Sequence, residues 1–207
     1  MAAPLPSLPA EPFELSGGDL CLDFANTWGD RERPATERLV SYGDLLAFAQ
    51  AACGFQASDL HALGAQATAH PARAMSVLRR ALTLREVLYR LFSAQARGGA
   101  TAAGDLEQLN ARLGPALAHL RLGTQAGGFP WVWAGVGEHL DAPLWPILRS
   151  AADLLASPRL AQVRECDGLQ CTWLFLDFSR AHSRRWCSMA SCGNRAKARR
   201  HHQRKYA

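Results

Sequence analysis

Four cysteines near the C-terminus have the type and spacing of a metal site. Cys166 and Cys171 form one pair with four residues between them, and Cys187 and Cys192 repeat that spacing. Fifteen residues separate the pairs, enough chain for a hairpin that brings the second pair to the opposite side of one ion. Four thiolates close a tetrahedral coordination sphere, so we expect one structural Zn²⁺ without an open catalytic position.

The segment that holds the second pair is strongly basic. Residues 179–207 contain nine Arg and Lys and no Asp or Glu, whereas the rest of the chain has 14 basic and 18 acidic side chains. Such asymmetry is typical of a protein in which the C-terminal tail binds a polyanion and the rest of the chain has a separate function. The predicted nucleic-acid contacts are Arg184, Arg185, Arg195, Lys197, Arg199, Arg200, Arg204 and Lys205.

Residues beside the metal also have internal interpretations. Arg195 could offset thiolate charge, and Asn194 could stabilise a turn; for these two the sequence favours neither role. The aromatic residues of the finger could stack on bases, but aromatics on so small a unit more often form its core, which is the interpretation we favour. They are Trp173, Phe175 and Trp186.

The N-terminus and the apolar segments indicate where in the cell the protein is expected. Residues 1–12 are rich in Ala and Pro and lack the basic and apolar regions of a secretory signal, so we expect a disordered lead. No apolar stretch approaches the roughly 18 residues that a membrane-spanning helix needs. We therefore expect a cytoplasmic protein without a membrane partner, in which reduced thiols bind metal.

Residues 13–157 have the pattern of a mainly helical domain, with a boundary at Ser157–Pro158. The expected helices cover 41–53, 58–69, 71–97, 105–119 and 141–156. We expect Gly114–Pro115 to break the fourth, Asp141 to cap the fifth, and a hairpin to join 120–122 to 129–133. The alternation in residues 20–24 fits a short strand or an extended entry into a helix.

Residues 160–207 have the layout of a zinc finger. We expect residues 172–178 to form a strand that pairs with 183–186, and the second cysteine pair to open a terminal helix. The positive end of that helix beside Cys192 would favour its thiolate. The predicted fold class is α+β: a mostly helical N-terminal domain with a small β-hairpin, followed by a treble-clef-like finger.

A polar cluster in the body is a candidate for ligand binding. Asp23, Asn26 and Thr27 follow an apolar run and could contact a small-molecule effector. Asn and Thr before a helix also cap it routinely, and we favour that role.

The finger resembles a known family. Residues 192–195 read Cys-Gly-Asn-Arg and follow Arg-Trp-Cys-Ser-Met at 185–189, and Phe-Leu-Asp-Phe-Ser-Arg at 175–180 lies between the pairs. This pattern is similar to the CGNR zinc finger. Residues 17–27, Gly-Gly-Asp-Leu-Cys-Leu-Asp-Phe-Ala-Asn-Thr, resemble the start of the ABATE domain that usually precedes it. The resemblance implies a bacterial, stress-induced transcription regulator with a DNA-binding finger.

The leading hypothesis for function is therefore a transcription regulator. Its finger would bind DNA, while the helical domain would sense a small molecule or mediate homodimerisation. One alternative is an RNA-binding protein, because a basic helix on a zinc knot also suits structured RNA. Another is a small-molecule enzyme whose finger is only structural, although no catalytic triad, phosphate loop or carboxylate pair stands out, and we expect no enzyme.

Overall fold

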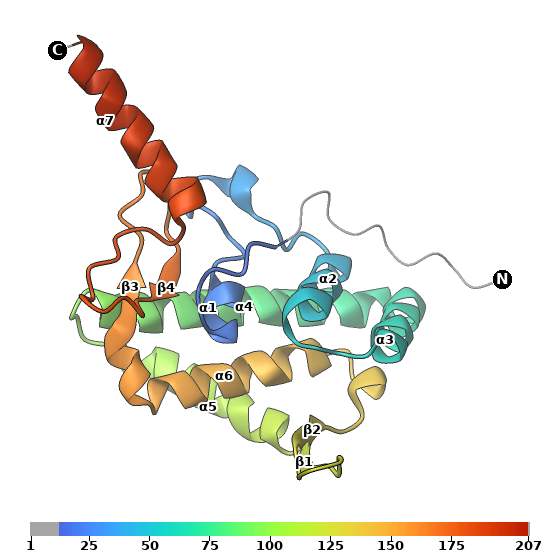
Figure 1. Cartoon of the computed structure of the whole chain (residues 1–207). Coiled ribbons are helices and arrows are strands. Elements are labelled where there is room, and N and C mark those ends of the chain that lie inside the picture. The colour runs from blue at the N-terminus through green and yellow to red at the C-terminus, as the bar shows by residue number, and fades with distance from the viewer. Residues whose placement is uncertain (1–12, 207) are drawn as a thin grey trace.

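The computed structural model describes residues 13–206. A helical body carries a small cysteine-rich unit, from which the last helix projects away (Figure 1). The expected disordered lead, residues 1–12, lies outside the described residues. None of the described helices combines the length and the apolar character that crossing a lipid bilayer requires.

The helices of the body begin and end at recognisable signals. The side chain of Ser41 accepts the Asp44 N–H at 3.2 Å, and Asp44 accepts the Ser41 N–H at 2.7 Å, which forms a capping box. Gly54 and Gly98, both at positive φ, follow the second and fourth helices. The helices are α1 Leu20–Ala25, α2 Tyr42–Ala52, α3 Ala57–Ala69, α4 Pro71–Ala96, α5 Ala103–Leu117 and α6 Trp145–Leu155.

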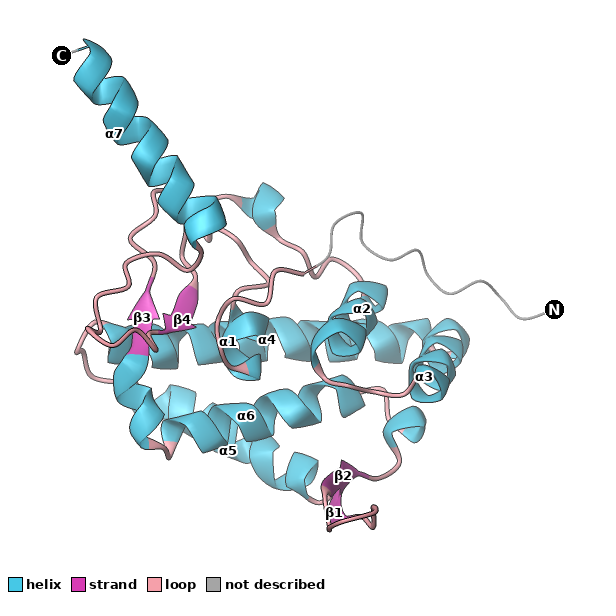
Figure 2. Ribbon diagram, viewed as in Figure 1, coloured by secondary structure: helices cyan, strands magenta, loops and turns pink. Residues whose placement is uncertain are grey.

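Helix α4 is the central element of the body. It spans 26 residues and packs against α1, α2, α3 and α5 and against the first strand of the finger. Leu84, Leu88 and Phe92, spaced four residues apart, are buried on the face that the other helices cover. Figure 2 shows α4 running behind α1 and α2 along most of the body. The finger and the helices are thus built on one scaffold.

The alternation of residues 20–24 marks a helix and not a strand. Leu20–Ala25 forms α1, which packs against α4 and α6. Cys21, Leu22, Phe24 and Ala25 are all buried because neighbours surround this short helix on several sides. A segment buried nearly all round has no polar face, so its sequence carries little helical periodicity.

Two expected features of the helices are wrong. Helix α5 continues through Pro115 to Leu117. Proline removes one hydrogen bond and disturbs the turn before it, but Pro115 lies in the last turn, so only two helical residues follow it. Residues Ala142–Leu144 form a 3₁₀ turn, so α6 starts at Trp145, and the side chain of Asp141 makes no capping bond.

The expected hairpin of the body is present. Strand β1, Leu120–Leu122, pairs antiparallel with β2, Trp131–Trp133, with Leu120 opposite Trp133. Trp145 is 2% exposed and stacks on His119 with ring centroids 3.8 Å apart, so it belongs to the core. Trp131 is 56% exposed and remains on the surface.

The strand pairing of the finger differs from the expectation. Strand β4, Leu174–Leu176, pairs antiparallel with β3, Val163–Glu165, and Val163 lies opposite Leu176. Residues 183–186 form no strand. The apolar side chain of Val163 reaches the body's core, which favours β3 as partner, whereas 183–186 wraps round the first cysteine loop, where Asp167 N–H donates to the Arg185 carbonyl at 2.9 Å. The first cysteine pair therefore lies in the hairpin loop.

The second cysteine pair leads into the terminal helix, as expected. A π-helical turn over Met189–Gly193 contains Cys192, and α7 follows directly at Asn194–Tyr206. Both ribbon views show α7 standing clear of the body with only its first turn near other elements (Figures 1 and 2).

Strand β4 joins the finger to the body. Leu174 and Leu176 belong to the same apolar core as the helices, whereas Phe175 packs with the cysteines. Successive side chains of a strand point to opposite faces, so β4 serves two cores at once. Trp173 and Trp186 are half-buried against the cysteine cluster, which confirms their interpretation as a miniature core.

Candidate metal centre and nucleic-acid interface

The four cysteine sulfurs converge on one point. All four Sγ atoms lie within 4.8 Å of one another. The Sγ atoms of Cys171 and Cys187 are 3.8 Å apart, and those of Cys187 and Cys192 are 3.7 Å apart. A zinc–sulfur bond of ~2.3 Å gives a tetrahedron with an edge of about 3.8 Å, whereas a disulfide would require about 2.05 Å. The donor set therefore fits a zinc ion.

The loop between the first two cysteines closes tightly over the sulfurs. A Cβ atom at Gly168 would lie 2.8 Å from Cys192 Sγ and 3.2 Å from Cys166 Sγ, so only glycine fits there. The backbone N–H groups of Gly168 and Cys187 point at Cys166 Sγ, with nitrogen–sulfur distances of 3.4 and 3.3 Å. Hydrogen bonds with the Cys171 and Cys187 thiols, aided by these N–H groups, hold the pKa of Cys166 far below its usual value. The thiolate form of Cys166, the form that binds metal, is therefore favoured.

The first residues of α7 serve the metal centre. Arg195 Nη2 donates to Cys192 Sγ at 2.8 Å. Burial lowers the pKa of Arg195, but the bond to the Cys192 sulfur outweighs it and the pKa is raised. Asn194 donates its side-chain N–H to the Ala190 carbonyl at 3.2 Å. Arg195 and Asn194 thus make the internal contacts that the sequence allowed as one of their two roles.

Two further arginines of the predicted set are also engaged within the finger. Arg184 is half-buried, donates to the carbonyls of Trp186 and Cys187, and lies over the Phe175 ring at 4.4 Å. Arg185 forms an exposed ion pair with Asp167 at 2.8 Å. Arg184 is therefore turned inward, whereas Arg185 stays at the surface.

The other predicted contacts lie along α7. Lys197, Arg200 and Arg204 are exposed and recur at the three- and four-residue spacing that aligns side chains on one side of a helix. Arg199 is half-buried and shares the opposite side with Arg195. Lys205 is exposed near the helix end. Since α7 has 13 residues and no acid, it is a cationic rod about 20 Å long.

The side chains of the candidate effector cluster, Asp23, Asn26 and Thr27, all make hydrogen bonds within the protein. Asn26 is 2% exposed, and its side-chain amide exchanges two hydrogen bonds with Leu174, to the backbone N–H and carbonyl, each at 2.8 Å. Thr27 donates its hydroxyl to the Phe24 carbonyl at 2.8 Å, and Asp23 accepts the Gly17 N–H at 2.7 Å. Asp23 lies within α1, and Asn26 and Thr27 follow its last residue, so the expected cap at a helix start is wrong. None of the three lines a described cavity.

Other residues that anchor the finger carry no local sequence signal. Glu165, next to Cys166, accepts two hydrogen bonds from Arg97 at 2.7 Å and one from the Tyr89 hydroxyl at 3.0 Å. Arg31 donates to the Thr172 hydroxyl, beside Cys171, at 3.1 Å. Each pair joins residues far apart in the chain, so neither could be found by spacing. Together they hold both sides of the first cysteine loop against the body.

Two family models match the chain. The model named ABATE, described as "Putative stress-induced transcription regulator", matches residues 18–158. The model of the CGNR zinc finger matches residues 162–205. A search of curated proteins returned no match. The finger match and the four clustered cysteines together assign one structural zinc ion to this site.

Proposed function

We propose that this chain, which belongs to the ABATE family and ends in a CGNR zinc finger, regulates transcription by binding duplex DNA through α7. One observation carries the proposal: α7 is a cationic helix without acids that stands clear of the body and is held at its first turn beside the metal centre. The ABATE and finger matches support a regulator or nucleic-acid-binding role.

The dimensions of α7 suit a major groove. That groove is about 12 Å wide and accepts an α-helix with its side chains. Lys197, Arg200 and Arg204 line one side of α7 and Arg199 the other, so cations would approach the phosphates of both strands. Zinc would contribute by fixing the direction of the helix relative to the body.

The zinc ion has a structural role in this proposal. Four thiolates leave no coordination position for water or substrate, and we propose that the protein has no catalytic activity of its own. A single helix contacts few base edges, so specific binding would require a homodimer or a partner protein. Effector sensing by the helical domain stays a prediction.

The decisive test compares charge removal on α7 with charge removal elsewhere. Fluorescence anisotropy of zinc-loaded protein is measured on a mixed-sequence duplex and a hairpin RNA over a range of salt concentrations. The double variant Arg200→Ala/Arg204→Ala should lower the salt slope by roughly 1.8, about 0.9 for each lost phosphate contact. The matched control is Arg79→Ala/Arg80→Ala, which removes two exposed neighbouring arginines from α4.

The outcomes separate the alternatives. Tight duplex binding that only the α7 variant weakens supports the regulator. Clear preference for the hairpin RNA would favour the RNA-binding alternative over the DNA-binding regulator. Equal losses in the two double variants would mean that overall charge, and not α7, determines binding.

A further inference from the structure

We propose that the helical body also contacts the nucleic acid: the groove between α7 and residues 29–36 receives the backbone of one strand, and Arg33 binds a phosphate there. This inference rests on the proposed function of α7. It adds a contact from outside the finger, on a segment whose four consecutive charged residues, Asp-Arg-Glu-Arg at 30–33, have no net charge.

The groove lies at the base of α7. It has a volume of about 660 Å³ and is open to solvent. One wall is the 29–36 segment, the second is the loop between Cys166 and Cys171, and the third is the first turns of α7. Figure 1 shows the short turn of residues 34–36 next to the start of α7. A strand that follows α7 toward the body would therefore enter this groove.

Arg33 is placed at the meeting point of the body and the finger. Its Nη1 donates to the side-chain carbonyl of Gln170, in the first cysteine loop, at 2.9 Å. In the described part of the chain Arg33 makes no ion pair, and its side chain is exposed. A guanidinium has five N–H donors, so most of them remain for a phosphate.

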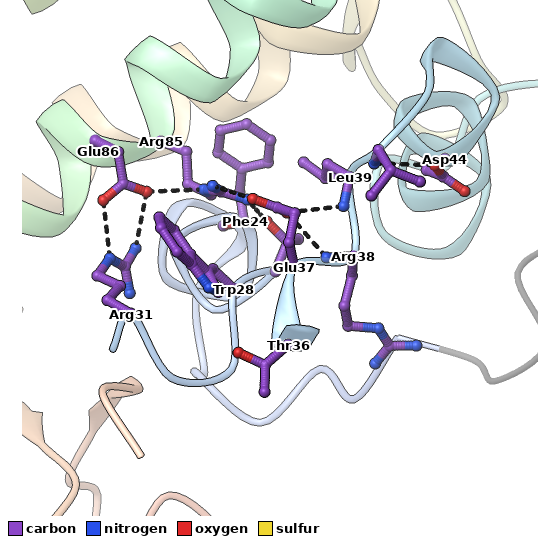
Figure 3. Close-up of polar contacts among 12 residues, drawn as sticks. Phe24, Trp28, Arg31, Thr36, Glu37, Arg38, Leu39, Asp44, Arg85 and Glu86 are labelled. Carbon is purple, nitrogen blue, oxygen red and sulfur yellow. Dashed lines mark hydrogen bonds and ion pairs between the residues drawn. The ribbon is translucent and has the colours of Figure 1, made fainter. Parts of the chain in front are cut away.

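A buried ionic network holds the 29–36 segment in place. Arg85 is 2% exposed and binds both carboxylate oxygens of Glu37 at 2.6 Å, while its Nε contacts Glu86 at 2.9 Å. Glu86 in turn pairs with Arg31 at 2.9 Å. Figure 3 shows Arg31, Trp28 and Glu37 gathered round Arg85 and Glu86 of α4. Since α4 fixes both ends of the segment, little entropy would be lost when Arg33 contacts a ligand.

The finger fixes the same segment from the other side. Thr172 N–H donates to the Gly29 carbonyl at 3.3 Å, and Arg31 reaches the Thr172 hydroxyl. Within the segment, the Thr36 hydroxyl accepts the Asp30 N–H at 2.9 Å. The distance between Arg33 and the start of α7 is therefore set by the fold, as a two-part interface requires.

The charges of the groove favour a bound strand over a small free anion. Arg33, Arg195 and Arg199 line it together with Glu14 and Glu32, and Arg195 is committed to Cys192. With two carboxylates present, the groove attracts small free anions weakly. A strand already held by α7 meets it at high effective concentration, so single contacts to Arg33 and Arg199 suffice.

The test uses charge changes of opposite sign at one rim of the groove. In the full-length zinc-loaded protein, Arg33→Ala should weaken duplex binding by on the order of fivefold and lower the salt slope by about 0.9. Glu32→Gln should strengthen binding by a similar factor, an effect that misfolding would not produce. Arg73→Ala, an exposed arginine of α4 that does not line the groove, is the control.

Three results would overturn the inference. The first is a salt slope for Arg33→Ala equal to that of Arg73→Ala while Arg200→Ala/Arg204→Ala weakens binding, which leaves α7 as the interface and removes the body from it. The second is Glu32→Gln binding that stays unchanged or weakens. The third is absence of duplex binding by the unmodified protein, which would overturn the proposed function as well. Zinc content and the thermal midpoint verify that each variant is folded.

Discussion

The carboxyl group of Asp23 lies where its charge is disfavoured. Burial, together with the nearby charge of Asp19, raises the pKa of Asp23 to about 6, although the Gly17 N–H bond works against the shift. The folded state therefore holds this proton more tightly than the unfolded chain, whose Asp pKa is near 3.9. The contribution of the protonated Asp23 carboxyl to the free energy of unfolding is fully present below about pH 4 and is lost as the pH rises through about 6.

Replacement of Asp23 should reveal that pH dependence. Asp23→Asn retains an acceptor for the Gly17 N–H but no longer ionises, so the variant should be more stable than the unmodified protein at pH 7.5 by about 2–3 kcal/mol. The gain should shrink as the pH falls toward 5. Urea unfolding at several pH values measures it, and a gain independent of pH would contradict the raised pKa.

At the scale of elements, the side chain of Asn26 satisfies the edge of β4 at which a third strand would otherwise pair. Asn26 binds both backbone groups of Leu174, much as a neighbouring strand would. Asn26→Ala leaves a buried N–H and a buried carbonyl without partners, each at a cost of roughly 1–3 kcal/mol. We expect a loss of several kcal/mol in unfolding free energy, measured by urea denaturation. Asn110→Ala, at an exposed site of α5, should change it little, and equal effects would refute the clamp.

For the whole molecule, the position of β4 between the helical core and the cysteine cluster predicts which parts lose order when zinc is removed. After chelation, the cysteine loops and the start of α7 should lose order, because their bonds to sulfur depend on the metal centre. Strand β4 should remain, since Leu174 and Leu176 are held by the helical core and by Asn26.

Hydrogen exchange of the zinc-free protein measures this directly. The amides of Leu174 and Leu176 should stay protected while those of Cys187 and Gly193 exchange rapidly. Zinc-loaded protein is the control, in which all four should be protected. Loss of protection throughout β4 on chelation would mean that the metal, and not the body, holds the hairpin.

Much of this architecture follows from short-range patterns. The four cysteines, the basic tail and helices such as Tyr42–Ala52 were predicted because spacing, charge runs and capping boxes act over a few residues. The pairing of β4 was mispredicted because two nearby segments competed for it, and only contact with the helical core favours Val163. The same holds for Pro115, whose effect depends on how close it lies to the helix end.

The sequence by itself determined the metal ligands, the family and the cationic character of α7, because each is a property of residues close together in the chain. Only the tertiary structure decided that Asn26 holds the finger, that Arg184 turns inward, and that Arg33 stands beside α7. The contacts of Asn26 and Arg33 join segments separated by long stretches of chain. Those of Arg184 are to nearby residues, the carbonyls of Trp186 and Cys187, but depend on how the chain folds round the finger. In each case the partners are selected by packing and by the need to satisfy buried polar groups.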